Sequence, residues 1–319
     1  MEYIAPDSVL AVRVFREGGA ISHHQMTLEQ ARVSYDKVCQ VNAVLVPGDV
    51  ATDDIAGGKP AVNLRRYRPA GTPPGGPAVV FVHGGGWVMG SVDTHDAICR
   101  YLSLAAGATV FSVDYRLAPE HPYPAAADDC AAAVDFVLDP SSGLDIDPAR
   151  VVLAGDSAGG QLVASLVNRR LRAGTLPFLA GVVLVYPVTD LTMKGRSHRE
   201  VTGFPLVHDT MSWFINQYVP ANMDRGAADL SPGLHPVPAG HPPTYIATVH
   251  NDPLRSEGRD YARALKAAGA LRRHDHFDGH HHGLLTNAGA IPTGRVLLDS
   301  IASFIRDVPA TSNTESDIR

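Results

Sequence analysis

The chain has 319 residues, of which 45% are hydrophobic and 19% charged, and it carries a formal net charge of −6 with a pI near 6.2. This length suits one large globular unit with an elaboration, or two smaller units. The mild acidity gives no electrostatic reason to expect a nucleic acid or an anionic membrane as partner. No segment has the roughly 18 to 20 uninterrupted apolar residues needed to span a bilayer, so no membrane partner is expected.

The N-terminus and the cysteines indicate the compartment. Residues 1–10 lack a basic region followed by a long apolar stretch, so no signal peptide is expected. Cys39, Cys99 and Cys130 are widely spaced and odd in number, which favours a buried free thiol at each position. Together these features predict a cytoplasmic protein.

Helical and strand patterns alternate along most of the chain. Thr27 and Gln30 have the spacing of a capping box and predict a helix over residues 27–39, and Pro/Gly-rich connecting segments follow at 47–60 and 69–77. Further predicted strands cover residues 61–68, 78–82, 108–113, 151–154, 181–186, 244–249 and 271–277, and further predicted helices cover 94–106, 125–138, 158–172, 210–218, 256–268 and 294–306. Apolar strands separated by helices predict an α/β fold with a mostly parallel sheet covered on both faces.

A serine at a strand–turn–helix junction is the sharpest chemical signal. The motif Gly155-Asp156-Ser157-Ala158-Gly159 follows a predicted strand and precedes a helix, which is the setting of a nucleophile elbow. Glycine is needed two residues to either side because a Cβ there would crowd the neighbouring backbone. The bare pattern arises by chance in roughly one such chain in six, so the prediction that Ser157 is the nucleophile depends on its setting.

A glycine-rich loop follows the predicted strand 78–82. The stretch His83-Gly84-Gly85-Gly86-Trp87 is more specific than the elbow, since HGGG is expected by chance in about one chain in a hundred. Its glycines leave backbone N–H groups free to face a developing oxyanion. We expect Gly84, Gly85 and Ala158 to donate to the oxyanion, and His83 to orient the loop. A phosphate loop is the alternative, but the lysine and the serine or threonine that end such loops are missing.

Candidate partners for the serine lie downstream in the order that this arrangement requires. Asp252 follows a predicted strand, at the edge of the sheet where active sites of open α/β sheets lie. Three adjacent histidines, His280, His281 and His282, follow the next strand, and spacing alone does not choose the base among them. Contiguous histidines do not readily converge on one ion, so neither a metal nor an organic cofactor is expected.

In combination these motifs resemble those of the hormone-sensitive-lipase-like esterases, the family with the G-D-S-A-G elbow. The matching stretches are 83–87, 114–125, 155–160, 242–248, 252–255 and 282–283. The resemblance implies the α/β-hydrolase fold and a triad of Ser157, Asp252 and His282. It also implies a cap built from residues 1–45 and 190–228 over a core of 46–189 and 229–308, which leaves a polar tail, 309–319, expected to be disordered. Small departures at Ser256 and Leu284 leave the triad intact.

The predicted activity is hydrolysis of short to medium acyl esters through an acyl-enzyme. The candidate pocket residues are aromatic or large and apolar: Trp87, Tyr186, Phe204, Leu206, Trp213 and Phe214. Those in the insert are first of all expected to pack the cap on the core, and an apolar substrate wall is the rival interpretation. A lactone or amide (arylformamidase-like) hydrolase and a non-catalytic receptor are the alternative functions. The partner is a small ester, and a homodimer is left open.

Overall fold

A computed structural model describes residues 3–17, 21–72, 75–203 and 206–308 of the chain. Two sequence predictions, the pocket residue Phe204 and the tail 309–319, lie outside these described residues.

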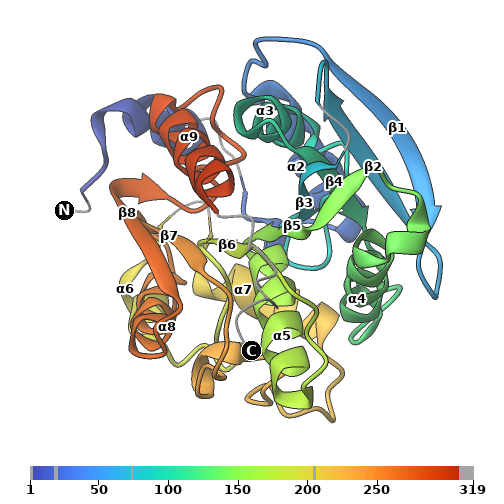
Figure 1. Cartoon of the computed structure of the whole chain (residues 1–319). Coiled ribbons are helices and arrows are strands. Elements are labelled where there is room, and N and C mark those ends of the chain that lie inside the picture. Colours follow the sequence, from blue (N-terminus) through green and yellow to red (C-terminus); the bar gives the residue numbers. More distant parts are fainter. Residues whose placement is uncertain (1–2, 18–20, 73–74, 204–205, 309–319) are drawn as a thin grey trace.

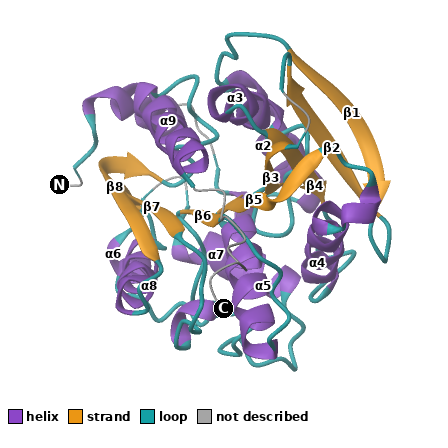
Figure 2. Ribbon diagram, viewed as in Figure 1, coloured by secondary structure: helices purple, strands orange, loops and turns teal. Residues whose placement is uncertain are grey.

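A single eight-stranded sheet crosses the centre of the molecule (Figure 1; Figure 2). Its strands in chain order are β1 (Val50–Gly57), β2 (Val62–Pro69), β3 (Gly76–Val82), β4 (Thr109–Asp114), β5 (Ile146–Asp156), β6 (Gly181–Val185), β7 (Thr244–Asn251) and β8 (Leu271–His281). Across the sheet the order is β1-β2-β4-β3-β5-β6-β7-β8. Strand β2 runs antiparallel to both of its neighbours, and all other neighbouring pairs are parallel. The predicted fold class is therefore confirmed.

Helices cover both faces of the sheet because its central strands are apolar on both sides. Helices α3 (Asp96–Ala106) and α9 (Pro292–Asp307) lie on one face, and α4 (Ala125–Leu138), α5 (Ala158–Ala173) and α8 (Arg255–Ala267) lie on the other (Figure 1). In β3, Val79 and Phe81 pack in the core beneath α3 and α9, while Val80 and Val82 pack in the core beneath α4, α5 and α8, as the alternation of side chains along a strand requires. The sheet is therefore packed against a buried core on each of its faces.

One strand and two α-helices of the described residues differ from the sequence prediction. Residues 50–57, taken as a connecting segment, form the edge strand β1, whose exposed side chains hide the alternation of a half-buried strand. Its register on β2 includes an ion pair between Asp53 and Arg66, with a carboxylate oxygen 2.8 Å from Nε. Helices α1 (Val9–Glu17) and α6 (Ser197–Glu200) were also missed.

The N-terminal segment and the insert after β6 meet beside the core. Helix α2 (Leu28–Val41) begins with the predicted capping box, in which Thr27 Oγ1 accepts from the Gln30 N–H at 3.2 Å. The insert contributes α7 (His208–Tyr218), and a hydrogen bond of 2.9 Å joins His24 Nδ1 to Thr210 Oγ1. The boundaries of the predicted cap stay a prediction.

All three cysteines are buried and free, as expected from the sequence. Among the described residues, no helix combines the length and the apolar character that a membrane crossing would require.

Candidate active site

Ser157 occupies a strained turn between β5 and α5. Its backbone has φ 53° and ψ −116°, a sparsely populated conformation of the kind concentrated at functional sites. The two flanking glycines permit the turn, because a Cβ on Gly155 would lie 2.6 Å from the Gly159 carbonyl and a Cβ on Gly159 would overlap the Val82 carbonyl oxygen. The turn therefore directs Ser157 Oγ away from the sheet at the N-terminus of a helix.

Asp252 and His282 meet Ser157 from two other strand ends. Asp252 lies just after β7 and is fully buried, and its Oδ2 accepts from the Nδ1–H of His282 at 2.8 Å. Because a carboxylate only accepts, this contact fixes the His282 tautomer and leaves Nε2 as an acceptor. Ser157 Oγ lies 2.9 Å from that nitrogen. The structure thus brings the three residues predicted from sequence into one hydrogen-bonded chain.

The neighbouring histidines face other groups. His280 Nε2 lies 3.0 Å from Asp7 Oδ1 in the N-terminal segment. The Nδ1–H of His281 donates to the His282 carbonyl, and burial lowers the pKa of His281 to about 4. Among these three, only His282 contacts both Ser157 and Asp252.

The glycine loop after β3 supplies N–H donors beside Ser157, but not the expected pair. The Gly84 N–H donates to Asp156 Oδ1 at 2.8 Å and is already engaged, so the structure contradicts Gly84 as an oxyanion donor. The N–H groups of Gly85, Gly86 and Ala158 donate to no other residue in the described part of the chain. The free N–H of Gly86 makes this residue a candidate donor in place of Gly84, and a Cβ there would overlap the Phe214 ring.

A buried carboxylate holds this loop against the elbow. Asp156 Oδ1 accepts from Gly84 and lies 3.2 Å from Nε2 of the fully buried His95. Burial alone would raise the Asp156 pKa, but His95 and the Gly84 N–H together lower it below the ordinary value. His83 also fixes the loop, since its Nδ1–H donates to the Gly84 carbonyl at 2.8 Å. Burial and His95 lower the pKa of His83 to about 3, so that its ring is neutral.

Ser157 and His282 line a cavity of about 430 Å³ whose surface is mostly apolar. The floor carries the catalytic candidates with Gly85, Gly86 and Tyr186, whose ring centroid is 4.5 Å from that of His282. The roof consists of side chains from the N-terminal segment and the insert, namely Phe15, Ile21, His23, Met26, Tyr35, Val38, Leu206, Met211 and Phe214. The N-terminal lining residues were not singled out from the sequence, because no local pattern shows which helix face covers a cavity.

Two predicted pocket residues lie elsewhere. Trp87 is not among the described residues that line the cavity. Its ring is fully buried, and its backbone has a φ of 61°. Its Nε1–H donates to Gln161 Oε1 at 3.0 Å, and it stacks on Tyr218 with ring centroids 4.6 Å apart. Trp213 packs on Phe214 with centroids 5.1 Å apart and is likewise not among the described lining residues. Both tryptophans were wrong as pocket residues.

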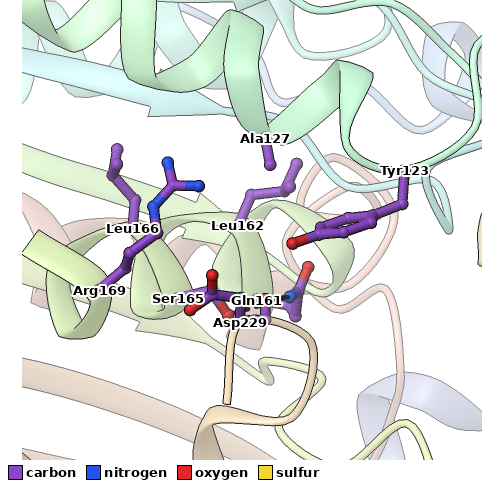
Figure 3. A pocket seen from close by; sticks show the side chains of 8 residues that line it. All are labelled: Tyr123, Ala127, Gln161, Leu162, Ser165, Leu166, Arg169 and Asp229. Atoms are coloured by element: carbon purple, nitrogen blue, oxygen red, sulfur yellow. Dashed lines mark hydrogen bonds between the residues drawn. The ribbon is translucent and has the colours of Figure 1, made fainter. Parts of the chain in front are cut away.

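A second hollow lies along α5 (Figure 3). It measures about 10 Å³ and is bounded by Tyr123, Gln161, Arg169 and Asp229 among others. This volume holds about one water molecule, so it is too small for an ester. Its significance is structural, since Gln161 at its base holds Trp87.

Residues 79–286 match a protein family described as having the alpha/beta hydrolase fold. The chain is 41% identical over 247 residues to the carboxylic ester hydrolase LipN of Mycobacterium tuberculosis, covering 74% of this chain and 64% of that protein. It is 39% identical over 238 residues to the carboxylesterase NlhH of the same species, covering 69% and 72%. An ethyl acetate hydrolase of Pseudomonas putida is 37% identical over 209 residues, covering 65% and 66%.

Solved structures with a similar fold extend over nearly the whole chain. An alpha/beta hydrolase from the metagenome of Lake Arreo superposes with a TM-score of 0.89 at 32% identity, covering 96% of this chain and 98% of that one. An esterase of Pyrobaculum calidifontis superposes with a TM-score of 0.86 at 33% identity, covering 96% and 100%. The similarity therefore includes the N-terminal segment and the insert as well as the sheet.

Proposed function

We propose that this chain, which belongs to the α/β-hydrolase family that it matches over residues 79–286, is a serine carboxylesterase. Its motifs resemble those of the hormone-sensitive-lipase-like esterases. It hydrolyses short to medium acyl esters through an acyl-enzyme. The observation that carries the proposal is the pair of contacts that links Ser157 Oγ to His282 at 2.9 Å and His282 to the buried Asp252 at 2.8 Å.

In the first half of the reaction, Ser157 Oγ attacks the ester carbonyl carbon. Its proton passes to His282 Nε2, and Asp252 stabilises the resulting imidazolium. The carbonyl oxygen becomes an oxyanion that accepts from the N–H groups of Gly85, Gly86 and Ala158. The bond to the alcohol oxygen then breaks, His282 returns the proton to that oxygen, and the acyl group stays on Ser157.

In the second half, a water molecule replaces the alcohol. His282 takes one proton from this water while the hydroxide oxygen attacks the acyl carbon. The same N–H groups stabilise the second oxyanion. The ester bond to Ser157 breaks, Oγ regains its proton from His282, and the carboxylic acid leaves.

The cavity supports an acyl ester of limited length. About 430 Å³ lies within the range of small-molecule pockets, and such pockets are mostly apolar with a few placed polar groups. Here Met26, Met211 and Phe214 supply apolar surface above Ser157. Met side chains adapt to ligands of different shape, which favours a range of acyl groups over a single one.

Removal of the nucleophile tests the proposal. We expect Ser157→Ala to lower kcat for p-nitrophenyl butyrate by about 10³-fold or more, with an unchanged circular dichroism spectrum. The matched control is Ser34→Ala, which removes another hydroxyl that lines the same cavity and should leave kcat within a few-fold of the wild type. A rigorously purified Ser157→Ala protein that retains wild-type activity would refute the proposal.

The same triad could cleave a lactone or an activated amide, and a panel of esters, lactones and anilides separates these activities. A receptor function is disfavoured because Ser157, Asp252 and His282 form an unbroken hydrogen-bonded chain. We also propose a cytoplasmic location, which the three buried free cysteines support. A homodimer stays a hypothesis that light scattering of the purified protein can test.

A further inference from the structure

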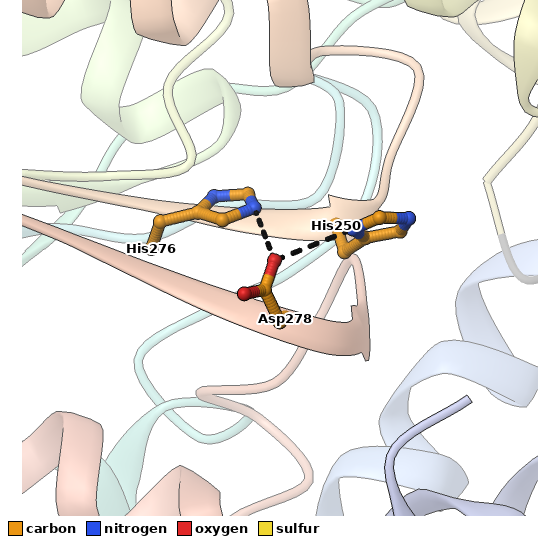
Figure 4. Close-up of side chains that lie close together, drawn as sticks. All are labelled: His250, His276 and Asp278. Carbon is orange, nitrogen blue, oxygen red and sulfur yellow. Dashed lines mark hydrogen bonds and ion pairs between the residues drawn. The ribbon is translucent and has the colours of Figure 1, made fainter. Parts of the chain in front are cut away.

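Two histidines and an aspartate converge at the edge of the sheet, outside the catalytic cavity (Figure 4). His250 belongs to β7, and His276 and Asp278 belong to the edge strand β8. Each offers one ligand atom, and these atoms lie within 4.8 Å of one another. None of the three is among the described residues that line the cavity above Ser157.

The strand register explains why these side chains meet. Residues 276 and 278 are two apart on β8 and therefore share one face of the sheet. Thr248 of β7 pairs with His276, and the register shifts between Val249 and Asn251. His250, two residues beyond Thr248, consequently reaches Asp278, with Nδ1 3.4 Å from Oδ1.

His276 is held in the orientation that a metal ligand needs. Its Nδ1 lies 2.8 Å from Thr248 Oγ1, which fixes the ring. Its Nε2 is buried, makes no aligned hydrogen bond with any described residue, and lies 3.2 Å from Asp278 Oδ1. Metal-ligating histidines typically use one ring nitrogen for the ion and the other for such an orienting contact.

The cationic side chain of Arg259 acts electrostatically on His276. A metal ion at this cluster would therefore meet some repulsion.

Two of the three separations between the ligand atoms also fit a metal ion, and the third, between the two ring nitrogens, is within 4.8 Å. Zinc binds imidazole nitrogen and carboxylate oxygen at about 2.0–2.2 Å in tetrahedral geometry, which places neighbouring ligand atoms about 3.3–3.6 Å apart. The observed separations from Asp278 Oδ1 are 3.2 and 3.4 Å. Two nitrogens and one oxygen suit zinc and similar transition ions better than calcium or magnesium, which prefer oxygen ligands.

We propose that His250, His276 and Asp278 form a binding site for a divalent transition ion of the zinc type, with water completing the coordination. Asp278 is mostly exposed, so the ion has access from solvent. The positive charge of Arg259 opposes a cation, and we therefore expect moderate affinity. This site differs from the expectation of no metal, which concerned the contiguous histidines 280–282; His250, His276 and Asp278 become neighbours only through the pairing of β7 with β8.

Such an ion would tie β7 to β8, and the C-terminal ends of these two strands deliver Asp252 and His282. Its expected effect is therefore on stability, since an ion that binds only the folded state raises the melting temperature. The site takes no part in ester hydrolysis, and the inference does not depend on the proposed function.

Zinc titration of protein without a polyhistidine tag tests the proposal. By isothermal calorimetry we expect about one Zn²⁺ per chain, with Asp278→Asn and His276→Gln each weakening the affinity by about tenfold or more. Asp278→Asn is the safer variant because its side chain is exposed. His121→Gln, which removes an exposed histidine elsewhere, is the matched control and should bind like the wild type.

Two further readouts accompany the titration. At Zn²⁺ about 100-fold above the dissociation constant, the wild type should melt about 3–6 °C higher, whereas Asp278→Asn should shift much less and Mg²⁺ should shift neither. Ester hydrolysis by metal-free Asp278→Asn should equal that of the metal-free wild type, which shows an intact fold. Failure of the wild type to bind Zn²⁺, or binding by Asp278→Asn within threefold of the wild type, would overturn the proposal.

Discussion

The floor and the roof of the cavity are built in different ways. Ser157 and His282 on the floor, and the buried Asp252 behind them, come from the ends of strands in a sheet that is covered on both faces. The roof comes from the N-terminal segment and the insert, which contribute mainly apolar side chains. Under the proposed function, the floor supplies the reacting groups and the roof supplies the surface that the acyl chain contacts, so we expect substitutions in the two regions to have different kinetic effects.

The largest expected effect comes from the buried carboxylate of Asp252, which orients His282 beneath the floor. Asp252→Asn keeps the shape but its amide can donate to Nδ1, which favours the wrong His282 tautomer. We expect kcat/KM for p-nitrophenyl butyrate to fall by about 10³–10⁴-fold, with little change in KM. Steady-state kinetics and circular dichroism check this. A loss of less than tenfold would show that Asp252 does not orient the base.

The next largest effect is expected from a substitution that releases the loop with the proposed oxyanion donors. Asp156→Ala removes the acceptor that holds the Gly84 N–H, and we expect kcat to fall by about 10²-fold because the donors are less well placed. Asp156→Asn retains an acceptor oxygen and should stay within about tenfold of the wild type. Equal kcat values for the two variants would contradict a positioning role for this oxygen.

The roof should change selectivity instead of the chemical step. Val38 lines the cavity and 43% of its surface is exposed, so we expect Val38→Trp to reduce the space in the cavity with little effect on folding. We expect kcat/KM for p-nitrophenyl octanoate to fall about tenfold while the value for the acetate ester changes less than twofold.

Val41→Trp on the same helix is the control for that substitution. Val41 is 74% exposed and is not among the described lining residues, so its replacement should leave both esters unaffected. If Val38→Trp lowered kcat/KM equally for the octanoate and acetate esters, the roof would not determine selectivity for acyl chain length.

The smallest effect concerns the attachment of the roof. Arg32 of α2 donates to the Val88 carbonyl at 2.9 Å and to Glu120 at 2.7 Å, and the Arg32 hydrogen bond lowers the Glu120 pKa to about 2. Because the folded-state pKa is below the ordinary 4.5, the stabilisation is complete above about pH 4.5 and is lost as the pH falls toward 2.

Glu120→Gln should therefore lower the free energy of unfolding by no more than about 1 kcal/mol at pH 7, since the pair is half-exposed. The difference from the wild type should shrink by more than half by about pH 3. Urea titrations at the two pH values measure it, and a difference that grows on acidification would contradict the assignment.

Sequence reasoning succeeded where local rules decide. The elbow glycines, the capping box at Thr27 and the apolar strands all depend on neighbours in the chain, and the structure shows each as expected. The edge strand β1 was missed because its exposed residues have no apolar alternation. The choice of His282 among the three adjacent histidines depended on the family resemblance, because the local sequence does not show which of them reaches Ser157.

The errors at the site share one cause. Gly84 looked like a free donor, but its N–H bonds to Asp156, 72 residues away. Trp87 looked like a pocket residue, but it bonds to Gln161, 74 residues away. Contacts between distant segments decided both cases, and the same is true of the N-terminal residues that cover the cavity.

The central claim is that Ser157 is the one activated hydroxyl at the floor of this cavity. Reaction with a fluorophosphonate, followed by peptide mass spectrometry, tests it most directly. We predict a single adduct on the peptide that contains Ser157, complete loss of that adduct in Ser157→Ala, and full labelling in Ser34→Ala. An adduct on a different residue, or equal labelling of Ser157→Ala, would contradict the account.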